Sequence, residues 1–179
     1  MAFTAFHCAL VWPLFILRPK RFDFIGLSVG AVIPDLFMPF VIFLPAYEKV
    51  ARIITHSLIG AITFDLILAL LASLFIVPKI IQYFKERSSD TRVYKFAGID
   101  VLEQRGRPSV IIYSILIGTV SHVLLDILYH ENNPVFYPCG DVIFPLVDSI
   151  LLDIIAHGIV FLAFFYLAYN YWWKTLSLV

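Results

Sequence analysis

The sequence predicts an all-α membrane protein, built as a single domain over residues 1–179 with about five transmembrane helices. Of its 179 residues, 61% are hydrophobic and only 15% are charged, and the mean hydropathy is +0.91. A soluble domain is closer to half apolar and a quarter charged, so the surplus indicates lipid as the surrounding medium. The formal net charge is zero. The composition therefore gives no sign of nucleic-acid binding, and the expected partner is membrane lipid.

The apolar segments are close to the length of about 20 residues that a helix needs to cross a bilayer. We expect spans over residues 3–17, 24–46, 53–78, 109–130 and 142–172. The first is short, and no positive charge precedes it, so we interpret it as a retained span rather than a signal peptide. The second contains prolines at positions 34, 39 and 45. The fifth is long enough to include a short lead-in helix.

Basic residues predict the orientation of these spans, because Lys and Arg concentrate in cytoplasmic loops. If the sides alternate, eleven of the basic residues fall on one face and two, Lys49 and Arg52, on the other. The richer face is then cytoplasmic, which places the N-terminus outside and the C-terminus inside a multi-pass cell-membrane protein. The segment 79–108 becomes a polar cytoplasmic loop that contacts lipid headgroups. Within it, "RVYKFAGIDVL" is compatible with a short strand pair.

Ionisable side chains inside membrane spans are costly and by default indicate function. In this chain they are His7, Asp35, His56, Asp65, His122, Asp126, Asp148, Asp153 and His157. The predicted orientation, set from Lys and Arg alone, brings nearly all of them towards the outer face. Imidazoles and carboxylates are the ligands of zinc and related ions, and a divalent ion would balance the buried carboxylates. We therefore expect a metal site in the outer half of the membrane.

The stretch "SHVLLDILYH" supplies the best pair of ligands. His122 and Asp126 are one helical turn apart and can converge on one ion. His130 is a further turn away, about 12 Å along the axis from His122. It cannot easily share that ion, so we expect it to orient a ligand or to face substrate. A purely structural hydrogen-bonded His/Asp pair between helices is the alternative interpretation.

Four short motifs occur in order: "MAFTAFH", "GAVIPDL", "ITHSLIG" and "SHVLLDILYH". Together they resemble the inner-membrane-associated metal-dependent hydrolases and their archaeal and bacterial relatives. The resemblance implies a metal site formed by His7, Asp35, His56, His122 and Asp126. The chain departs from the family pattern near Arg52, where the family has an additional histidine. If that histidine is a ligand or an acid–base group, another side chain must replace it here.

The remaining polar residues allow several interpretations. Asp148 and Asp153 either cap the last span, where negative charge is favourable, or orient a ligating histidine. For Asp65 and His157, which lie deeper, we prefer hydrogen bonding between helices. Cys8 and Cys139 are both predicted outside, where a disulfide or a thiolate ligand is possible, although thiols without a role are the preferred interpretation.

Two functions are compatible with these residues. The first is a hydrolase in which zinc or a similar divalent ion activates water, with Asp35 and Asp126 as candidates for either ligand or general base. Its location favours an ester or phosphoester that is lipid-linked or close to the membrane. The alternative is non-enzymatic: a metal or proton transporter, or a scaffold whose polar groups fix helix packing. Transport needs polar groups over the full membrane depth, and here they become sparse towards the cytoplasmic half.

Overall fold

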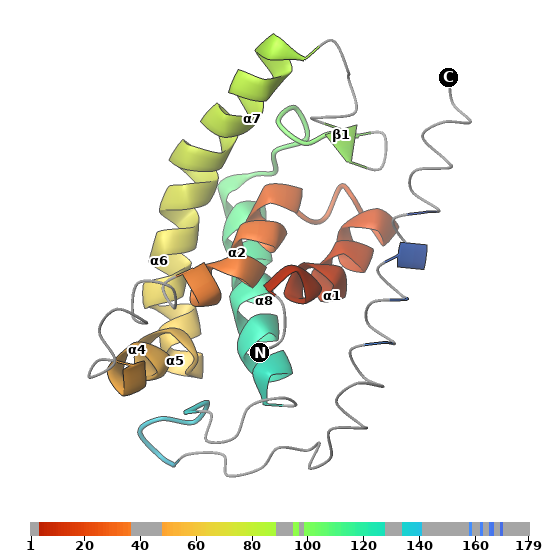
Figure 1. Ribbon diagram of the computed structural model, residues 1–179. Coiled ribbons are helices and arrows are strands. Elements are labelled where there is room, and N and C mark those ends of the chain that lie inside the picture. Colours follow the sequence, from red (N-terminus) through yellow and green to blue (C-terminus); the bar gives the residue numbers. More distant parts are fainter. Residues whose placement is uncertain are drawn as a thin grey trace.

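The computed structural model describes residues 4–36, 48–88, 95–96, 99–127 and 134–140, with the single positions 158, 162, 165, 166 and 169. Within this part of the chain nearly all regular structure is helical, which confirms the all-α class (Figure 1). The five single positions are also helical. The rest of the predicted fifth span, 142–172, lies outside the described residues.

The first two helices agree with the predicted spans where they are described. Helix α1 covers Thr4–Leu17, and α2 covers Phe24–Leu36. The start of α2 is set by Asp23, whose Oδ1 accepts a hydrogen bond of 2.6 Å from the backbone N–H of Gly26. A carboxylate in this position satisfies a backbone donor that the first turn of a helix leaves open. The remainder of the predicted second span, 37–46, is not among the described residues.

The third predicted span, 53–78, begins at the wrong residue. Helix α4 (Glu48–Thr55) ends before His56, and α5 (Leu58–Ile62) starts after Ser57, which has an extended backbone and caps α5 through a 3.0 Å bond from Gly60 N–H. A Cβ on Gly60 would lie 1.8 Å from the carbonyl oxygen of Ile54. Only glycine fits there, so "THSLIG" encodes a sharp turn at His56 rather than a continuous helix.

The same span also extends further than predicted. Helices α5 and α6 (Phe64–Leu71), the π-helical turn η2 (Ala72–Ile76) and α7 (Val77–Arg87) form one helix of 30 residues. Pro78 does not end it, because this proline lies in the first turn of α7 directly after the π turn, where a missing N–H is tolerated. Residues 79–87 are therefore helical, and the predicted loop 79–108 is shorter than expected.

The strand pair expected within "RVYKFAGIDVL" is confirmed. Strand β1 (Lys95–Phe96) pairs antiparallel with β2 (Ile99–Asp100). Lys85 Nζ of α7 donates a 2.9 Å hydrogen bond to Asp100. Desolvation alone would raise the pKa of Asp100, but this bond and those from the N–H groups of Leu102 and Glu103 hold it below its usual value. The hairpin is thereby fixed to the end of α7.

Helix α8 (Pro108–Asp126) is the centre of the bundle and agrees with the predicted span 109–130 as far as it is described. It packs most extensively on α2 (Figure 1). A Cβ on Gly30 would lie 2.5 Å from the carbonyl oxygen of Ile115, and one on Gly118 would lie 2.6 Å from that of Leu27. Glycine at both positions lets the two backbones approach closely, as small residues do in membrane helix pairs.

Two of the described helices, Leu58–Arg87 and Pro108–Asp126, are long and apolar enough to cross a membrane. Much of the surface of the first is apolar and exposed: Ile67 is 59% exposed, Phe75 60% and Ile76 55%. The end of α7 and the β1–β2 hairpin lie at one end of the molecule, and α4 and α5 lie at the other (Figure 1).

Buried polar groups occur near both ends of the bundle, and an apolar layer lies between them. At the hairpin end, Arg105 Nε donates to Asp23 Oδ2 at 3.0 Å, and Ser114 Oγ accepts from the N–H of Asp23 at 2.9 Å. In the middle, a buried cluster joins three helices through Ile33, Ala69, Ile111 and Ile115. The second polar group, at the opposite end, contains the histidines.

Candidate metal centre

Helix α8 supplies two buried residues of the histidine cluster. His122 is fully buried and Asp126 is 2% exposed. They are one turn apart on the same face, and His122 Nε2 lies 3.7 Å from Asp126 Oδ2. Because α8 packs tightly against α2 through Gly118, this pair faces the end of α2 and the turn before α5.

The backbone of α2 fixes the tautomer of His122. Its Nδ1 lies 2.8 Å from the carbonyl oxygen of Ala31. A carbonyl only accepts hydrogen bonds, so Nδ1 carries the proton. In the neutral ring the other nitrogen, Nε2, then presents a lone pair, and it is this nitrogen that faces the carboxylates. Metal-binding histidines are commonly oriented by such a bond from the remote nitrogen.

The turn between α4 and α5 orients His56 in the same way. The Thr55 hydroxyl donates to the carbonyl oxygen of Ala51 at 3.0 Å. Its single proton is thereby used, so at 2.7 Å from His56 Nδ1 it acts as the acceptor. Nε2 of His56 again presents a lone pair, 3.4 Å from Asp35 Oδ1 and 3.3 Å from Asp126 Oδ2.

Asp35 enters the cluster from α2, directly after Pro34. Its Oδ1 lies 3.4 Å from His56 Nε2 and 3.5 Å from His122 Nε2. Its side chain is 21% exposed, whereas those of His56, His122 and Asp126 are 4% exposed or less. Asp35 therefore forms the accessible side of the cluster.

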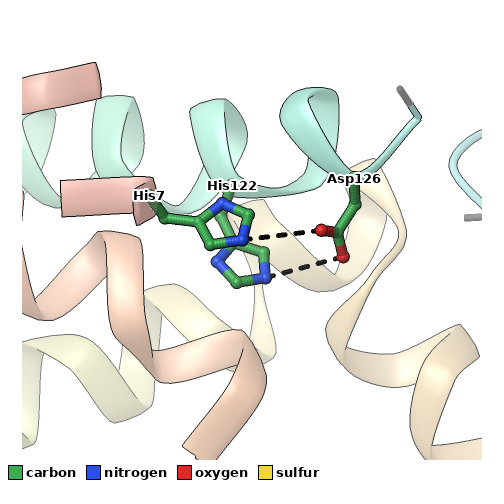
Figure 2. Close-up of side chains that lie close together, drawn as sticks. All are labelled: His7, His122 and Asp126. Atoms are coloured by element: carbon green, nitrogen blue, oxygen red, sulfur yellow. Dashed lines mark ion pairs between the residues drawn. The ribbon is translucent and has the colours of Figure 1, made fainter. Parts of the chain in front are cut away.

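Helix α1 contributes His7, which lies on the other oxygen of Asp126. His7 Nε2 is 3.5 Å from Asp126 Oδ1. Its ring stacks on that of His122 with centroids 3.7 Å apart. Figure 2 shows both rings directing a nitrogen at the same carboxylate. The two oxygens of Asp126 thus face different partners, His7 on one side and His56 with His122 on the other.

The spacing of these atoms suits a metal ion better than hydrogen bonds. A hydrogen bond between a histidinium and a carboxylate is about 2.7–2.9 Å long. The five N···O distances here range from 3.3 to 3.7 Å. Ligands about 2.0–2.1 Å from a tetrahedral zinc ion are about 3.3–3.4 Å from one another. Two trios satisfy the distances of a shared ion: His7, His122 and Asp126, and Asp35, His56 and His122.

Five residues predicted from the sequence thus meet at one place: His7, Asp35, His56, His122 and Asp126. Their roles as ligands or catalytic groups stay predictions. The other three predicted site residues, His130, Asp148 and Asp153, lie outside the described residues, as does His157. Both cysteines are free thiols; Cys8 is buried in the α1–α2 contact and Cys139 is exposed.

Several residues that organise this site were not found by sequence reasoning. Thr55 orients His56, and the carbonyl of Ala31 orients His122. The only sequence signal for the first contact is that Thr55 directly precedes His56. Asp65, for which the sequence favours hydrogen bonding between helices, is fully buried, and neither of its carboxylate oxygens has a hydrogen-bond partner within the described part of the chain.

Comparison with known proteins gives one match. A family model described as a domain of unknown function, DUF4184, matches residues 1–173. A search of curated proteins finds no match, and a search of solved structures finds none either. Because the family match covers nearly the whole length of the sequence, the chain belongs to the DUF4184 family.

Proposed function

We propose that this protein is a multi-pass membrane hydrolase that uses a divalent metal ion, with zinc as the preferred ion. Its substrate would be a lipid-linked or membrane-proximal ester or phosphoester at the outer face. One observation carries the metal assignment: hydrogen bonds from Nδ1 of both His56 and His122 leave acceptor nitrogens facing carboxylate oxygens. Buried acceptors that face one another repel unless a cation lies between them.

The division of roles follows from the contacts of Asp126 Oδ2 and from the exposure of Asp35. Catalytic zinc sites use three protein ligands and keep one position open. His56 Nε2 and His122 Nε2 approach Asp126 Oδ2 at 3.3 and 3.7 Å, so we assign His56, His122 and Asp126 as ligands, a set that combines members of both trios. His7, on Oδ1, orients Asp126. Asp35 is the accessible carboxylate, and we assign it as the general base that accepts a proton from water. An ion held there would supply Lewis-acid activation of that water near neutral pH.

The distribution of apolar and basic residues supports a membrane location for the protein, with the histidine cluster at the outer face. The exposed apolar surface of the 30-residue helix Leu58–Arg87 suits lipid. The basic residues of the hairpin end, including Lys85 and Arg105, lie away from the histidine cluster (Figure 1). Under the positive-inside rule that end is cytoplasmic and the histidine cluster is outside. The arrangement of five membrane spans is part of this proposal. The hydrolase activity that the resemblance to metal-dependent hydrolases implies is part of it as well.

The apolar layer argues against the transporter alternative. An ion or proton pathway needs polar groups through the full depth of the bundle. Between the histidine cluster and the Asp23–Arg105 pair, the described residues place buried Ile33, Ala69 and Ile115, with buried Thr119 and Ser114 of α8 on either side of Ile115. A metal-dependent ion flux across liposomes that contain the purified protein, with no lipid turnover, would favour transport instead.

The first test is metal content. We expect the protein purified in detergent to bind about one zinc ion per chain. His56→Ala, His122→Ala and Asp126→Asn should abolish that binding, as measured by elemental analysis after dialysis. Asp100→Asn is the matched carboxylate control at the hairpin end and should bind zinc as the wild type does. A wild-type protein without bound metal, or the same metal content in every variant, would contradict the metal assignment.

The second measurement addresses the reaction. The wild type, reconstituted with a mixture of membrane lipids, should release hydrolysis products that mass spectrometry detects. Asp35→Asn should keep its metal and lose about 10²–10⁴-fold in rate, which is the contribution of a positioned general base. If Asp35→Asn loses the metal as well, Asp35 is a ligand and the division of roles is wrong.

A further inference from the structure

Four basic residues near the hairpin end of the bundle are exposed. They belong to the turn after α1 and to the position directly before α8: Arg18, Lys20, Arg21 and Arg107. None of the four forms an ion pair within the described part of the chain. The acids closest to them in sequence are paired with other cations, since Asp23 faces Arg105, and Asp100 and Glu103 face Lys85. The four residues therefore give this surface an excess of positive charge.

A network of hydrogen bonds holds the two segments that carry these residues against each other. Arg105 Nε donates to Oδ2 of the buried Asp23 at 3.0 Å. The side-chain amide of Gln104 donates to the carbonyl oxygens of Pro19 and Phe22, to the second at 3.3 Å. The turn after α1 is thereby fixed beside the segment that leads into α8. The four exposed basic residues form one surface, which we name the basic platform.

The residue that precedes the basic platform indicates which kind of anion it faces. Leu17, the last residue of α1, is 77% exposed and is followed directly by Arg18. A large exposed apolar side chain next to a group of cations matches the boundary of a bilayer, where acyl chains meet phosphate groups. Basic residues just cytoplasmic of a membrane helix attract anionic lipids. An anionic phospholipid therefore fits both the charge and the apolar edge of this surface.

We propose that the basic platform binds the headgroup phosphate of an anionic phospholipid in the cytoplasmic leaflet. This inference rests on the proposed membrane location and orientation, and it is independent of the metal centre. Arginine guanidinium groups donate paired hydrogen bonds to phosphate oxygens, and lysine contributes a point charge. The platform joins the turn between α1 and α2 to the start of α8. A bound headgroup thus connects the three helices that carry His7, Asp35, His122 and Asp126.

The test is a lipid titration of the whole chain in detergent, followed by native mass spectrometry. We expect phosphatidylglycerol, which is anionic, to bind in preference to phosphatidylcholine, which has no net charge. The variant Lys20→Gln/Arg21→Gln should lower the affinity for phosphatidylglycerol about 25-fold, because each basic residue near anionic lipid contributes about fivefold. Lys79→Gln/Arg87→Gln is the matched control: it also removes one lysine and one arginine, both exposed on α7, and should bind phosphatidylglycerol as the wild type does.

Two further variants separate the loss of charge from damage to the turn. Lys20→Arg/Arg21→Lys keeps both charges and should keep the preference for phosphatidylglycerol. Arg107→Gln removes one charge from the other segment and should lower the affinity about fivefold. If Lys20→Gln/Arg21→Gln does not fold, Arg107→Gln still decides the outcome, because an unchanged affinity in that variant would overturn the inference.

Three other results would also overturn the inference. Equal binding of the two lipids by the wild type would show that charge does not select the lipid. Equal losses in the platform variant and the α7 variant would show that positive charge acts on this side without a defined site. Displacement of the lipid by an equal concentration of inorganic phosphate would show that the surface takes free phosphate. The membrane location fails separately, if the protein stays in solution without detergent.

Discussion

The hydroxyl of Thr55 decides which nitrogen of His56 faces the carboxylates. It donates to Ala51 and accepts from Nδ1, so Nε2 is left with its lone pair towards Asp35 and Asp126. Removing a partner that orients a metal-binding histidine typically lowers metal affinity about 10–100-fold. Thr55 therefore matters to the proposed metal site although it would not be a ligand itself.

We expect Thr55→Val to weaken zinc binding about 10–100-fold while the fold is kept, because valine has the same shape but cannot accept the bond from Nδ1. Isothermal titration with zinc measures the change. Thr63→Val is the matched control: Thr63 Oγ1 also donates to a carbonyl four residues earlier, that of Ile59, but its side chain is exposed. Equal affinities for the two variants would show that Thr55 does not orient His56.

The contact between α2 and α8 sets the distance between Asp35 and the His122–Asp126 pair. Gly30 and Gly118 lie at that contact, where a Cβ on either would be within 2.6 Å of a backbone oxygen of the other helix. Three site residues depend on it, because Asp35 ends one helix and His122 and Asp126 end the other. The position of Ala31, whose carbonyl fixes His122, depends on it as well.

Gly118→Leu should force the two helices apart, destabilise the protein by about 1–3 kcal/mol through overpacking, and abolish zinc binding. Thermal unfolding in detergent measures the first effect, and elemental analysis measures the second. Ser109→Leu, an equally large residue at an exposed position of α8, is the control and should change neither. Retention of zinc in Gly118→Leu would mean that the α2–α8 distance does not govern the site.

The whole molecule has two chemically different ends, and this difference supports the proposed orientation. Cys139 is exposed in the segment 134–140, which contacts the histidine end through a 3.0 Å bond between Leu58 N–H and the Val135 carbonyl. Glu103 lies beside the hairpin at the other end and is 79% exposed. A membrane between these two ends would place them in different compartments.

A thiol reagent that does not cross membranes should label Cys139 in intact cells, because the proposed orientation places it outside. A variant with Cys139→Ser and Glu103→Cys should be labelled only after the cells are opened. The remaining thiol, Cys8, is buried and should contribute little signal, which the single variant Cys139→Ser checks. Labelling of Glu103→Cys in intact cells would reverse the orientation, and labelling of both positions would exclude a membrane between them.

The helical class, the starts of α1, α2 and α8, and the five side chains that meet in the cluster could be predicted from the amino-acid sequence alone. The helices follow from the length of the apolar segments. The five side chains follow from the cost of placing ionisable groups in such segments, and from the ability of both imidazoles and carboxylates to bind metal ions. The short strand pair was also predictable, because "RVYKFAGIDVL" lies in a segment without clear helical periodicity.

The orientation of these side chains, by contrast, depends on contacts between helices that are far apart in sequence. Hydropathy could not predict the break at His56, because it depends on the close approach of Gly60 to the Ile54 carbonyl. It could not predict the passage through Pro78, which the π turn allows. The lone pairs of His56 and His122 are fixed by Thr55 and by a backbone carbonyl 91 positions away in sequence. Composition and periodicity describe which groups a helix carries, whereas contacts between helices determine which atom of each group faces the site.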